Sequence, residues 1–253
     1  MKKARSRFVE MVFVVGFLAL AACASASDTL ETTAAQISKK PKTFTLHGTI
    51  IDWVTHLPIA GASLCIENHP EISCVTTAAD GSYSLSGLPR RRTFAMTFQA
   101  LGYVSTASYL WTDAVDAQDT QWDAGYLTPG DYNFFVAAIG ETPDPSRGGL
   151  GAGAKIGSIV LTNPAVAGAQ FTTDPVDAPF HYFGTNGLPD PTLTATSEIG
   201  LSLAQVTAGE YDVYATYPDG LDCHSPEDGD SIHVTVRPGW LTIVNALCQQ
   251  SNE

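Results

Sequence analysis

The chain has 253 residues and is acidic, with 13 Lys and Arg against 26 Asp and Glu and a formal net charge of −13 at pH 7. This balance argues against nucleic-acid binding, which requires a basic surface, and against electrostatic attraction to anionic lipid. The length leaves room for two domains of about 100 residues each after a leader is removed.

Residues 1–22 predict a signal peptide. Four Lys and Arg side chains lie within the first seven positions, and an apolar run from residue 11 to residue 22 follows them. The run is shorter than the roughly 20 apolar residues that a bilayer-spanning helix needs. It ends in Leu-Ala-Ala-Cys at residues 20–23, which resembles the lipobox of bacterial lipoproteins.

The lipobox resemblance implies that Cys23 becomes the first residue of the mature chain and is acylated. Two or more acyl chains hold a protein stably on a membrane. Ala24 stands where lipoproteins of the inner membrane often carry Asp, which favours the outer membrane or the cell surface. Cleavage of an ordinary signal peptide near residues 22–26 is the alternative. The rest of the segment 23–42 is small and polar, which predicts a flexible tether.

Residues 43–130 alternate short apolar runs with Gly, Pro, Asn and Asp, which is typical of an all-β sandwich or barrel. The expected strands lie at 44–50, 62–66, 75–77, 83–85, 94–98, 105–110 and 126–127.

Residues 131–155 separate this pattern from a second one. A short helix is expected at 131–141, with Asp131 able to cap it, and the following Gly- and Pro-rich stretch predicts an interdomain linker. Residues 156–253 predict a second, divergent all-β domain. Its apolar residues alternate at 159–161, 211–215, 232–236 and 241–244.

The two halves repeat one another weakly. A longer connection in the second half falls at 174–192, where an insertion belongs in a surface loop. The matched segments are Ile59–Ser63 with Val166–Gln170, Thr77-x-x-x-Gly81 with Thr196-x-x-x-Gly200, and Leu85 with Leu203.

Several motifs of the first half follow one another in the order and spacing of a known family. They are Gly48-Thr49-Ile50, Pro58-Ile59-Ala60-Gly61-Ala62, Thr77 through Leu85, Leu88-Pro89 and Gly102-Tyr103. They resemble the carboxypeptidase regulatory-like domain, a transthyretin-like (prealbumin-like) sandwich related to the Cna-B-like domains of bacterial surface stalks. Ala78 departs from the family, which often has Asp there. The resemblance implies two tandem seven-strand β-sandwiches, the second matching more loosely.

The cysteines predict disulfides. With Cys23 taken by lipid, four remain in an exported chain, an even number that allows three pairings. Proximity in the sequence favours Cys65–Cys74 and Cys223–Cys248. No cysteine is then left over for a metal or for catalysis.

The sequence predicts neither an enzyme nor a cofactor or metal site. It has no His-Glu-x-x-His, no Gly-x-Ser-x-Gly and no nucleotide-binding glycine loop. Two acidic stretches, at 113–123 and 219–230, leave calcium binding open, although neither has the spacing of an EF-hand. An unrecognised catalytic site near His181 or His224 is a further alternative.

We therefore expect a non-catalytic lipoprotein, anchored through Cys23, that presents two β-sandwiches to an envelope protein or polysaccharide. Its role would be structural, adhesive or protein-binding. The main alternative is a carbohydrate-binding accessory lipoprotein, because exposed aromatic rings on a β-sandwich stack on sugars. The candidate rings are Trp111, Trp122, Tyr182 and Phe183.

Overall fold

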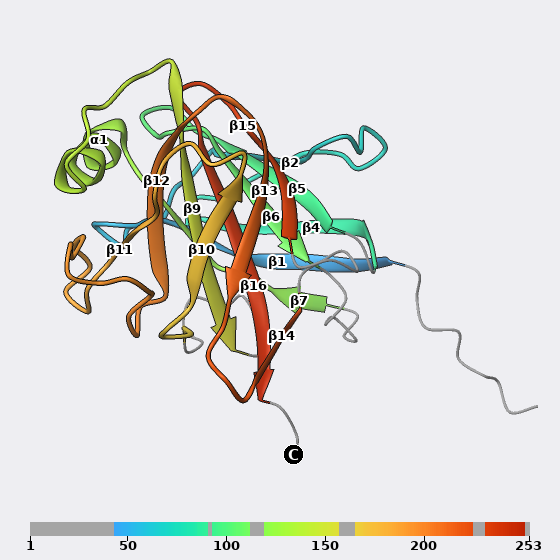
Figure 1. The fold of residues 1–253 in the computed structure, drawn as a ribbon. Coiled ribbons are helices and arrows are strands. Elements are labelled where there is room, and N and C mark those ends of the chain that lie inside the picture. The colour runs from blue at the N-terminus through green and yellow to red at the C-terminus, as the bar shows by residue number, and fades with distance from the viewer. Residues whose placement is uncertain (1–42, 91–92, 112–118, 157–164, 225–230, 251–253) are drawn as a thin grey trace, which may run out of the picture. The chain divides into compact units, whose positions relative to one another are not determined.

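A computed structural model of the chain describes residues 43–90, 93–111, 119–156, 165–224 and 231–250 (Figure 1). The predicted leader, Cys23 and the tether lie outside the described residues. Within the described part, a single α-helix accompanies strands that form several sheets. The expected all-β class is confirmed.

One sheet of the first sandwich is built on β1 (Thr43–Asp52). β1 pairs antiparallel with β4 (Ser82–Pro89) and parallel with β7 (Asp119–Gln121) and β8 (Ala124–Tyr126). β7 and β8 both pair with β1 and act as one strand interrupted at residues 122–123. Counted in this way, the strands of this half are the seven that the sequence predicts.

The facing layer of the first sandwich has the strand order β6-β5-β2-β3. Alternate side chains of both layers point inward, as the period of two along a strand requires. In β4, Tyr83 and Leu85 are buried while their neighbours are exposed. The core includes Phe98 and Tyr126, whose rings stack with centroids 3.7 Å apart. The bounds of this layer are β2 Ser63–Ile66, β3 Val75–Thr76, β5 Thr93–Gln99 and β6 Thr106–Trp111.

The second half also forms two facing layers around a core of its own. One layer is a three-stranded sheet in the order β10-β13-β15, and the other has the order β11-β12-β9-β16, with β14 paired to β16. The predicted strand at 159–161 lies outside the described residues. The bounds are β9 Arg147–Ile156, β10 Gln170–Asp174, β11 His181–Tyr182, β12 Leu201–Thr207, β13 Gly209–Thr216, β14 Leu221–His224, β15 Ser231–Val236 and β16 Leu241–Gln250.

A single nine-stranded sheet runs through both halves, because β16 pairs in parallel with β6 on one side and with β9 on the other. Figure 1 shows β16, in red, between these two strands. The prediction of a linker is wrong for residues 147–155, which form β9. Four glycines and two alanines in this strand hid it from propensity-based prediction.

The helix α1 (Pro129–Ala138) begins earlier than predicted. Its N-cap is Thr128, not Asp131, because Pro129 is well placed in the first turn, where its missing N–H costs nothing. The Thr128 hydroxyl accepts from the Asp131 backbone N–H at 3.2 Å and donates to the Asp131 carboxylate at 2.6 Å. This reciprocal pair closes the first turn.

The predicted repeat is visible in the hydrogen bonds of Thr77. Its buried hydroxyl donates to the carbonyl of Ile59 at 2.6 Å and accepts from the N–H of Ala62 at 2.9 Å. Its backbone carbonyl accepts from the N–H of Gly61 at 3.0 Å. The threonine thus fastens the loop before β2 to the end of β3.

Thr196 makes the same contacts in the second half. Its hydroxyl donates to the carbonyl of Val166 at 2.7 Å and accepts from the N–H of Ala169 at 2.9 Å. Its carbonyl accepts from the N–H of Gly168 at 2.7 Å. The match of Thr77 with Thr196 is therefore confirmed.

β9 is the counterpart of β1. The carbonyl of Ile50 in β1 accepts from the N–H of Ile59, and the carbonyl of Ala154 in β9 accepts from the N–H of Val166, each at 2.9 Å. These bonds fix which positions of the two strands correspond.

The predicted match of Leu85 with Leu203 is wrong by one residue. Leu85 pairs with Leu46 of β1, and the corresponding position of β9, Leu150, pairs with Ala204. A shift of one residue turns a side chain to the other face of a sheet. Ala204 accordingly lies in the core of the second sandwich, whereas Leu203 packs on the opposite face, against α1.

Candidate functional site

The two sandwiches meet at the pairing of β6 with β16, and side chains reinforce this junction. The Tyr109 hydroxyl in β6 accepts from the Thr235 N–H in β15 at 2.8 Å. The Leu241 N–H, at the start of β16, donates to the Ser105 carbonyl at 3.0 Å. Backbone and side chain therefore both connect the sandwiches.

An ion pair adds a third connection. Arg237, in the turn between β15 and β16, pairs with Glu67 directly after β2, and both side chains are about three-quarters buried. The Arg237 guanidinium also lies 4.9 Å from the ring centroid of Trp240. Arg237 is partly buried and contacts an aromatic ring. Its side chain is therefore held more firmly than that of an arginine in a fully exposed ion pair.

An apolar pocket lies on the outer face of the sheet, beside this junction. Its volume is about 120 Å³. Gly151 and Gly153 of β9 form part of its floor, and Leu241 and Ile243 of β16 continue it. None of the residues lining the pocket carries a charge.

Aromatic rings form one wall of the pocket. Phe135 of α1 and Phe183, directly after β11, meet edge to face with centroids 5.6 Å apart. Trp53, which follows β1, packs against Gly125 and closes another side. The half-buried Asn245 supplies an amide at the pocket.

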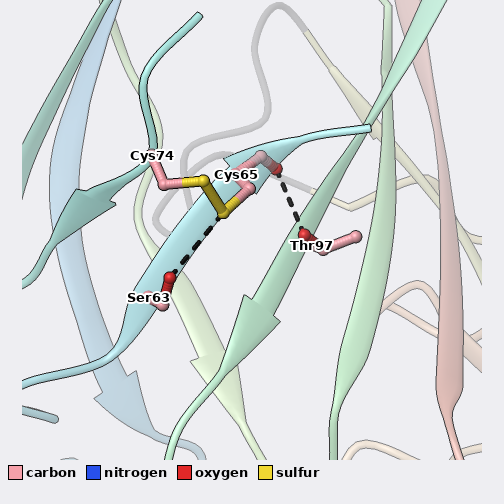
Figure 2. The surroundings of a disulfide bond; sticks show 4 residues. All are labelled: Ser63, Cys65, Cys74 and Thr97. Carbon is pink, nitrogen blue, oxygen red and sulfur yellow. Dashed lines mark hydrogen bonds between the residues drawn. A yellow bond between two sulfur atoms is a disulfide. The ribbon is translucent and has the colours of Figure 1, made fainter. Parts of the chain in front are cut away.

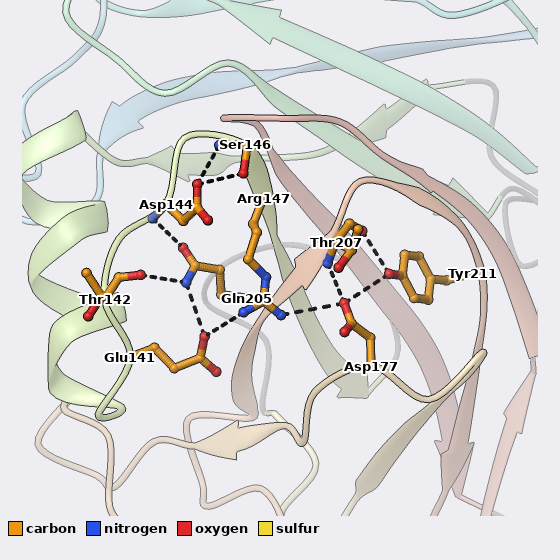
Figure 3. Close-up of polar contacts among 9 residues, drawn as sticks. All are labelled: Glu141, Thr142, Asp144, Ser146, Arg147, Asp177, Gln205, Thr207 and Tyr211. Carbon is orange, nitrogen blue, oxygen red and sulfur yellow. Dashed lines mark hydrogen bonds and ion pairs between the residues drawn. The ribbon is translucent and has the colours of Figure 1, made fainter.

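A network of polar side chains fastens the segment after α1 to the second sandwich (Figure 3). Gln205 of β12 is buried, and its side chain accepts from the Asp144 N–H at 3.0 Å. Its amide donates to the Thr142 carbonyl at 2.9 Å and to the Glu141 carboxylate at 3.1 Å. No pattern in the sequence predicted this network.

Arg147 extends the network to a second carboxylate. Its guanidinium lies 3.6 Å from Glu141 and 3.5 Å from Asp177. Asp177 also accepts from the Thr207 backbone N–H and from the Tyr211 hydroxyl. The bond from Thr207 is the main cause that holds the pKa of the Asp177 carboxyl below its ordinary value of 3.8.

The predicted disulfide Cys65–Cys74 is confirmed (Figure 2). It ties β2 to the segment just before β3. The Cys65 carbonyl accepts from the Thr97 hydroxyl of β5 at 3.3 Å, which holds that side of the loop to the sheet. Closing a loop of this size contributes about 3 kcal/mol in the chain-entropy account.

The second predicted disulfide is only partly described. Cys248 of β16 is buried and disulfide-bonded. It lies opposite Cys223 of β14 in the strand register. The pairing Cys223–Cys248 remains a prediction, and Cys23 lies outside the described residues.

The structure does not bring the candidate aromatics together on one exposed face. Trp122 is 4% exposed in the core of the first sandwich, and Tyr182 is 6% exposed in that of the second. Phe183 is 6% exposed against α1. The prediction that these rings form an exposed sugar-binding surface is wrong for these three, because large apolar side chains are usually buried in the core. Trp111 ends β6, and its side chain lies outside the described part.

The other candidate polar residues are scattered. His181 is half-buried in β11, and His224 ends β14. Much of both acidic stretches lies outside the described residues, but Asp123 is visible and accepts from the Thr49 N–H at 2.7 Å. This carboxylate replaces a ladder bond where β7 and β8 are interrupted. Among the described residues, no three His, Cys, Asp or Glu side chains gather as metal ligands would.

No family model and no curated protein matches the sequence. Solved structures that resemble it include GBS52, the minor pilin in Streptococcus agalactiae, with 14% identity and a TM-score of 0.29 over 83% of this chain and 97% of that one. The shaft pilin SpaA of Lactobacillus rhamnosus GG has 12% identity and a TM-score of 0.27 over 83% and 99%.

The Bacillus anthracis TIE protein has 14% identity and a TM-score of 0.27 over 83% of this chain. The chain spans 34% of that protein and 64% of a streptococcal ancillary pilin. TM-scores this low do not establish a shared fold, so nothing about this chain follows from these likenesses.

Proposed function

We propose that this chain is an exported, lipid-anchored protein without catalytic activity that holds two β-sandwiches as one unit at the cell envelope and binds an envelope protein there. The observation that supports this most is the nine-stranded sheet shared by both sandwiches. A shared sheet transmits force through backbone hydrogen bonds rather than through a hinge. Such a unit suits a structural or adhesive role.

The disulfide and the buried junction add to this support. Cys65–Cys74 cross-links one sandwich, and the Arg237–Glu67 pair fixes it to the other. Disulfides persist in oxidising compartments outside the cytoplasm, which agrees with export. Carbohydrate binding gains no comparable support, because three of the four candidate rings are buried.

The anchor belongs to this proposal through the lipobox at residues 20–23. Acyl chains on Cys23 would hold the protein on the outer membrane or cell surface, and the tether to residue 42 would give it reach. In the part of the chain that the structure describes, no helix has the length and apolar character to cross a bilayer.

The anchor is tested by fractionating bacteria that express the full chain. The wild type is expected to incorporate labelled fatty acid and to remain with the membranes, whereas Cys23→Ser is expected to lose the label and appear in the soluble exported fraction. Ala24→Ser is the matched control and should behave as the wild type. A Cys23→Ser protein that stays with the membranes as before would contradict lipid anchoring.

The binding role is tested by cross-linking on intact cells, followed by identification of the captured molecules. Repeated capture of one envelope protein, unchanged by glycan competitors, is the expected result. Capture of a polysaccharide without a protein would favour the carbohydrate-binding alternative.

A further inference from the structure

The floor of the apolar pocket differs from the equivalent surface of the first sandwich. With Ile50 aligned on Ala154, the outward positions Thr45, His47 and Thr49 of β1 correspond to Gly149, Gly151 and Gly153 of β9. The second sandwich therefore lacks side chains on this strand where the first has polar ones.

Close packing requires two of these glycines. A Cβ at Gly149 would lie 2.8 Å from the Tyr132 ring, and one at Gly153 would lie 2.6 Å from the Gly200 carbonyl. Gly151 is different, because a Cβ there would meet no atom closer than 3.6 Å. The side chain of a larger residue at position 151 would project into the pocket. Packing thus leaves room at Gly151, and the absence of a side chain keeps the pocket open.

The size and chemistry of the pocket define what fits. Its volume of about 120 Å³ is near that of an engineered cavity of about 150 Å³, lined by Leu, Ile and Phe, that binds benzene. One six-membered ring therefore fits, and a long acyl chain does not. A charged group would lose its hydration without gaining a partner, since no lining residue is charged.

The walls favour an aromatic ring over an aliphatic group of the same size. Phe135 and Phe183 already meet edge to face, and a further ring extends this arrangement. The amide of Asn245 offers a hydrogen bond to a polar substituent. An apolar body with few polar groups is the usual chemistry of a small-molecule site.

The pocket opens on the outer face of the sheet, where residues of both sandwiches line it. Trp53, Leu127, Ile243 and Asn245 line the pocket and are only half-buried. A ligand reaches the pocket there without opening either sandwich core.

We propose that this pocket binds a small uncharged ligand by holding one aromatic ring between the Phe135–Phe183 pair on one side and the glycine floor on the other, with a hydroxyl or an aromatic amine of the ligand bonded to Asn245. This site is independent of the lipid anchor and of the envelope partner.

The test uses the purified full chain and titrates phenol, with benzoate and cyclohexanol as comparison probes, while backbone amide signals are followed by NMR. Saturable shifts that concentrate at Gly151 and Gly153 are expected with phenol. Benzoate and cyclohexanol should bind at least about tenfold more weakly. Shifts that do not saturate, or that spread over the surface, would overturn the proposal.

Variants decide whether the pocket is responsible. Gly151→Leu should weaken phenol binding at least about tenfold, whereas the matched control His47→Leu, which places the same side chain at the equivalent position of β1, should leave it unchanged. If Gly151→Leu does not fold, Gly151→Ala carries the test, because its Cβ makes only ordinary contacts. Asn245→Leu should reduce the preference for phenol over benzene. Equal binding by wild type and both Gly151 variants would refute the site.

Discussion

Gly48 in β1 lies where the backbone between β7 and β8, at residues 122–123, comes closest to β1. A Cβ at this position would lie 2.0 Å from the Trp122 carbonyl oxygen, which itself accepts from the Tyr83 hydroxyl at 2.8 Å. The carbonyl is therefore held in place and does not give way. This contact explains why the Gly-x-Ile motif of β1 needs glycine.

We expect Gly48→Ala to lower the free energy of unfolding by about 3 kcal/mol, because the strand pairing must shift to admit the methyl group. Urea unfolding measures this. The matched control is Gly130→Ala in α1, where a Cβ has no contact closer than 3.7 Å. It should be neutral or slightly stabilising. Equal effects of the two substitutions would refute this account of Gly48.

Thr77 and Thr196 give a second prediction at this scale. Valine keeps the shape of each side chain but leaves a buried N–H and carbonyl without their partner, at a cost of about 1–3 kcal/mol. Thr77→Val and Thr196→Val should therefore destabilise the protein similarly, and their effects should add, since they share no partner. Thr172→Val, exposed on β10, is the control. A negligible effect of Thr196→Val alone would mean that the two threonines, although they make the same contacts, do not contribute equally to stability.

Among the elements, β9 shows where sequence reasoning failed. The strands of the first half, and β13, β15 and the start of β16, were predicted within a few residues, because their apolar residues alternate clearly. β10, β11, β12 and β14 had no predicted counterpart. β9 carries its inward face on Leu150, Ala152 and Ala154 and has glycines between them, so neither alternation nor β propensity marks it. The internal repeat held the missing signal, because a counterpart of β1 had to precede Val166. The pocket stayed hidden for the same reason.

The Asp177 carboxylate fastens the loop after β10 to the end of β12 and to β13, through Thr207 and Tyr211. Because the pKa of Asp177 is lowered in the folded state, its contribution to stability is fully present above the ordinary value of 3.8 and is lost as the pH falls below it through the folded pKa. Asp177→Asn should therefore weaken the protein near neutral pH and flatten the acid limb of its stability curve. Urea unfolding from pH 7 to pH 2 measures this. Asp219→Asn, an exposed aspartate, should leave the curve nearly unchanged, and an unaltered acid limb in Asp177→Asn would exclude this role.

At the scale of the whole molecule, the two sandwiches could be predicted from the sequence, but the sheet that they share could not. Local patterns in 43–130 reveal a sandwich because they record which side chains face inward. The pairing of β6 with β16 joins segments far apart in the sequence, and no local pattern specifies it. The aromatic candidates failed similarly, since composition does not distinguish a core tryptophan from an exposed one.

The shared sheet predicts that both sandwiches unfold together. Leu64→Ala in the first core and Val206→Ala in the second, both residues fully buried, should each lower the midpoint of one common transition. Tryptophan fluorescence and far-ultraviolet circular dichroism should give coincident urea curves. Leu57→Ala, at a side chain 64% exposed, should change little. Two separate transitions, each moved by one variant, would show that the sandwiches unfold independently.

The position of β16 also sets an order in time. β6 and β9 are both synthesised before the strand that pairs with each of them. During that interval each has an open edge, to which a strand of another molecule could add. Pairings between distant segments also form slowly. The growing chain is therefore most vulnerable to aggregation after β9 has emerged and before residues 241–250 arrive, and a chaperone that shields open strands would matter most in that interval.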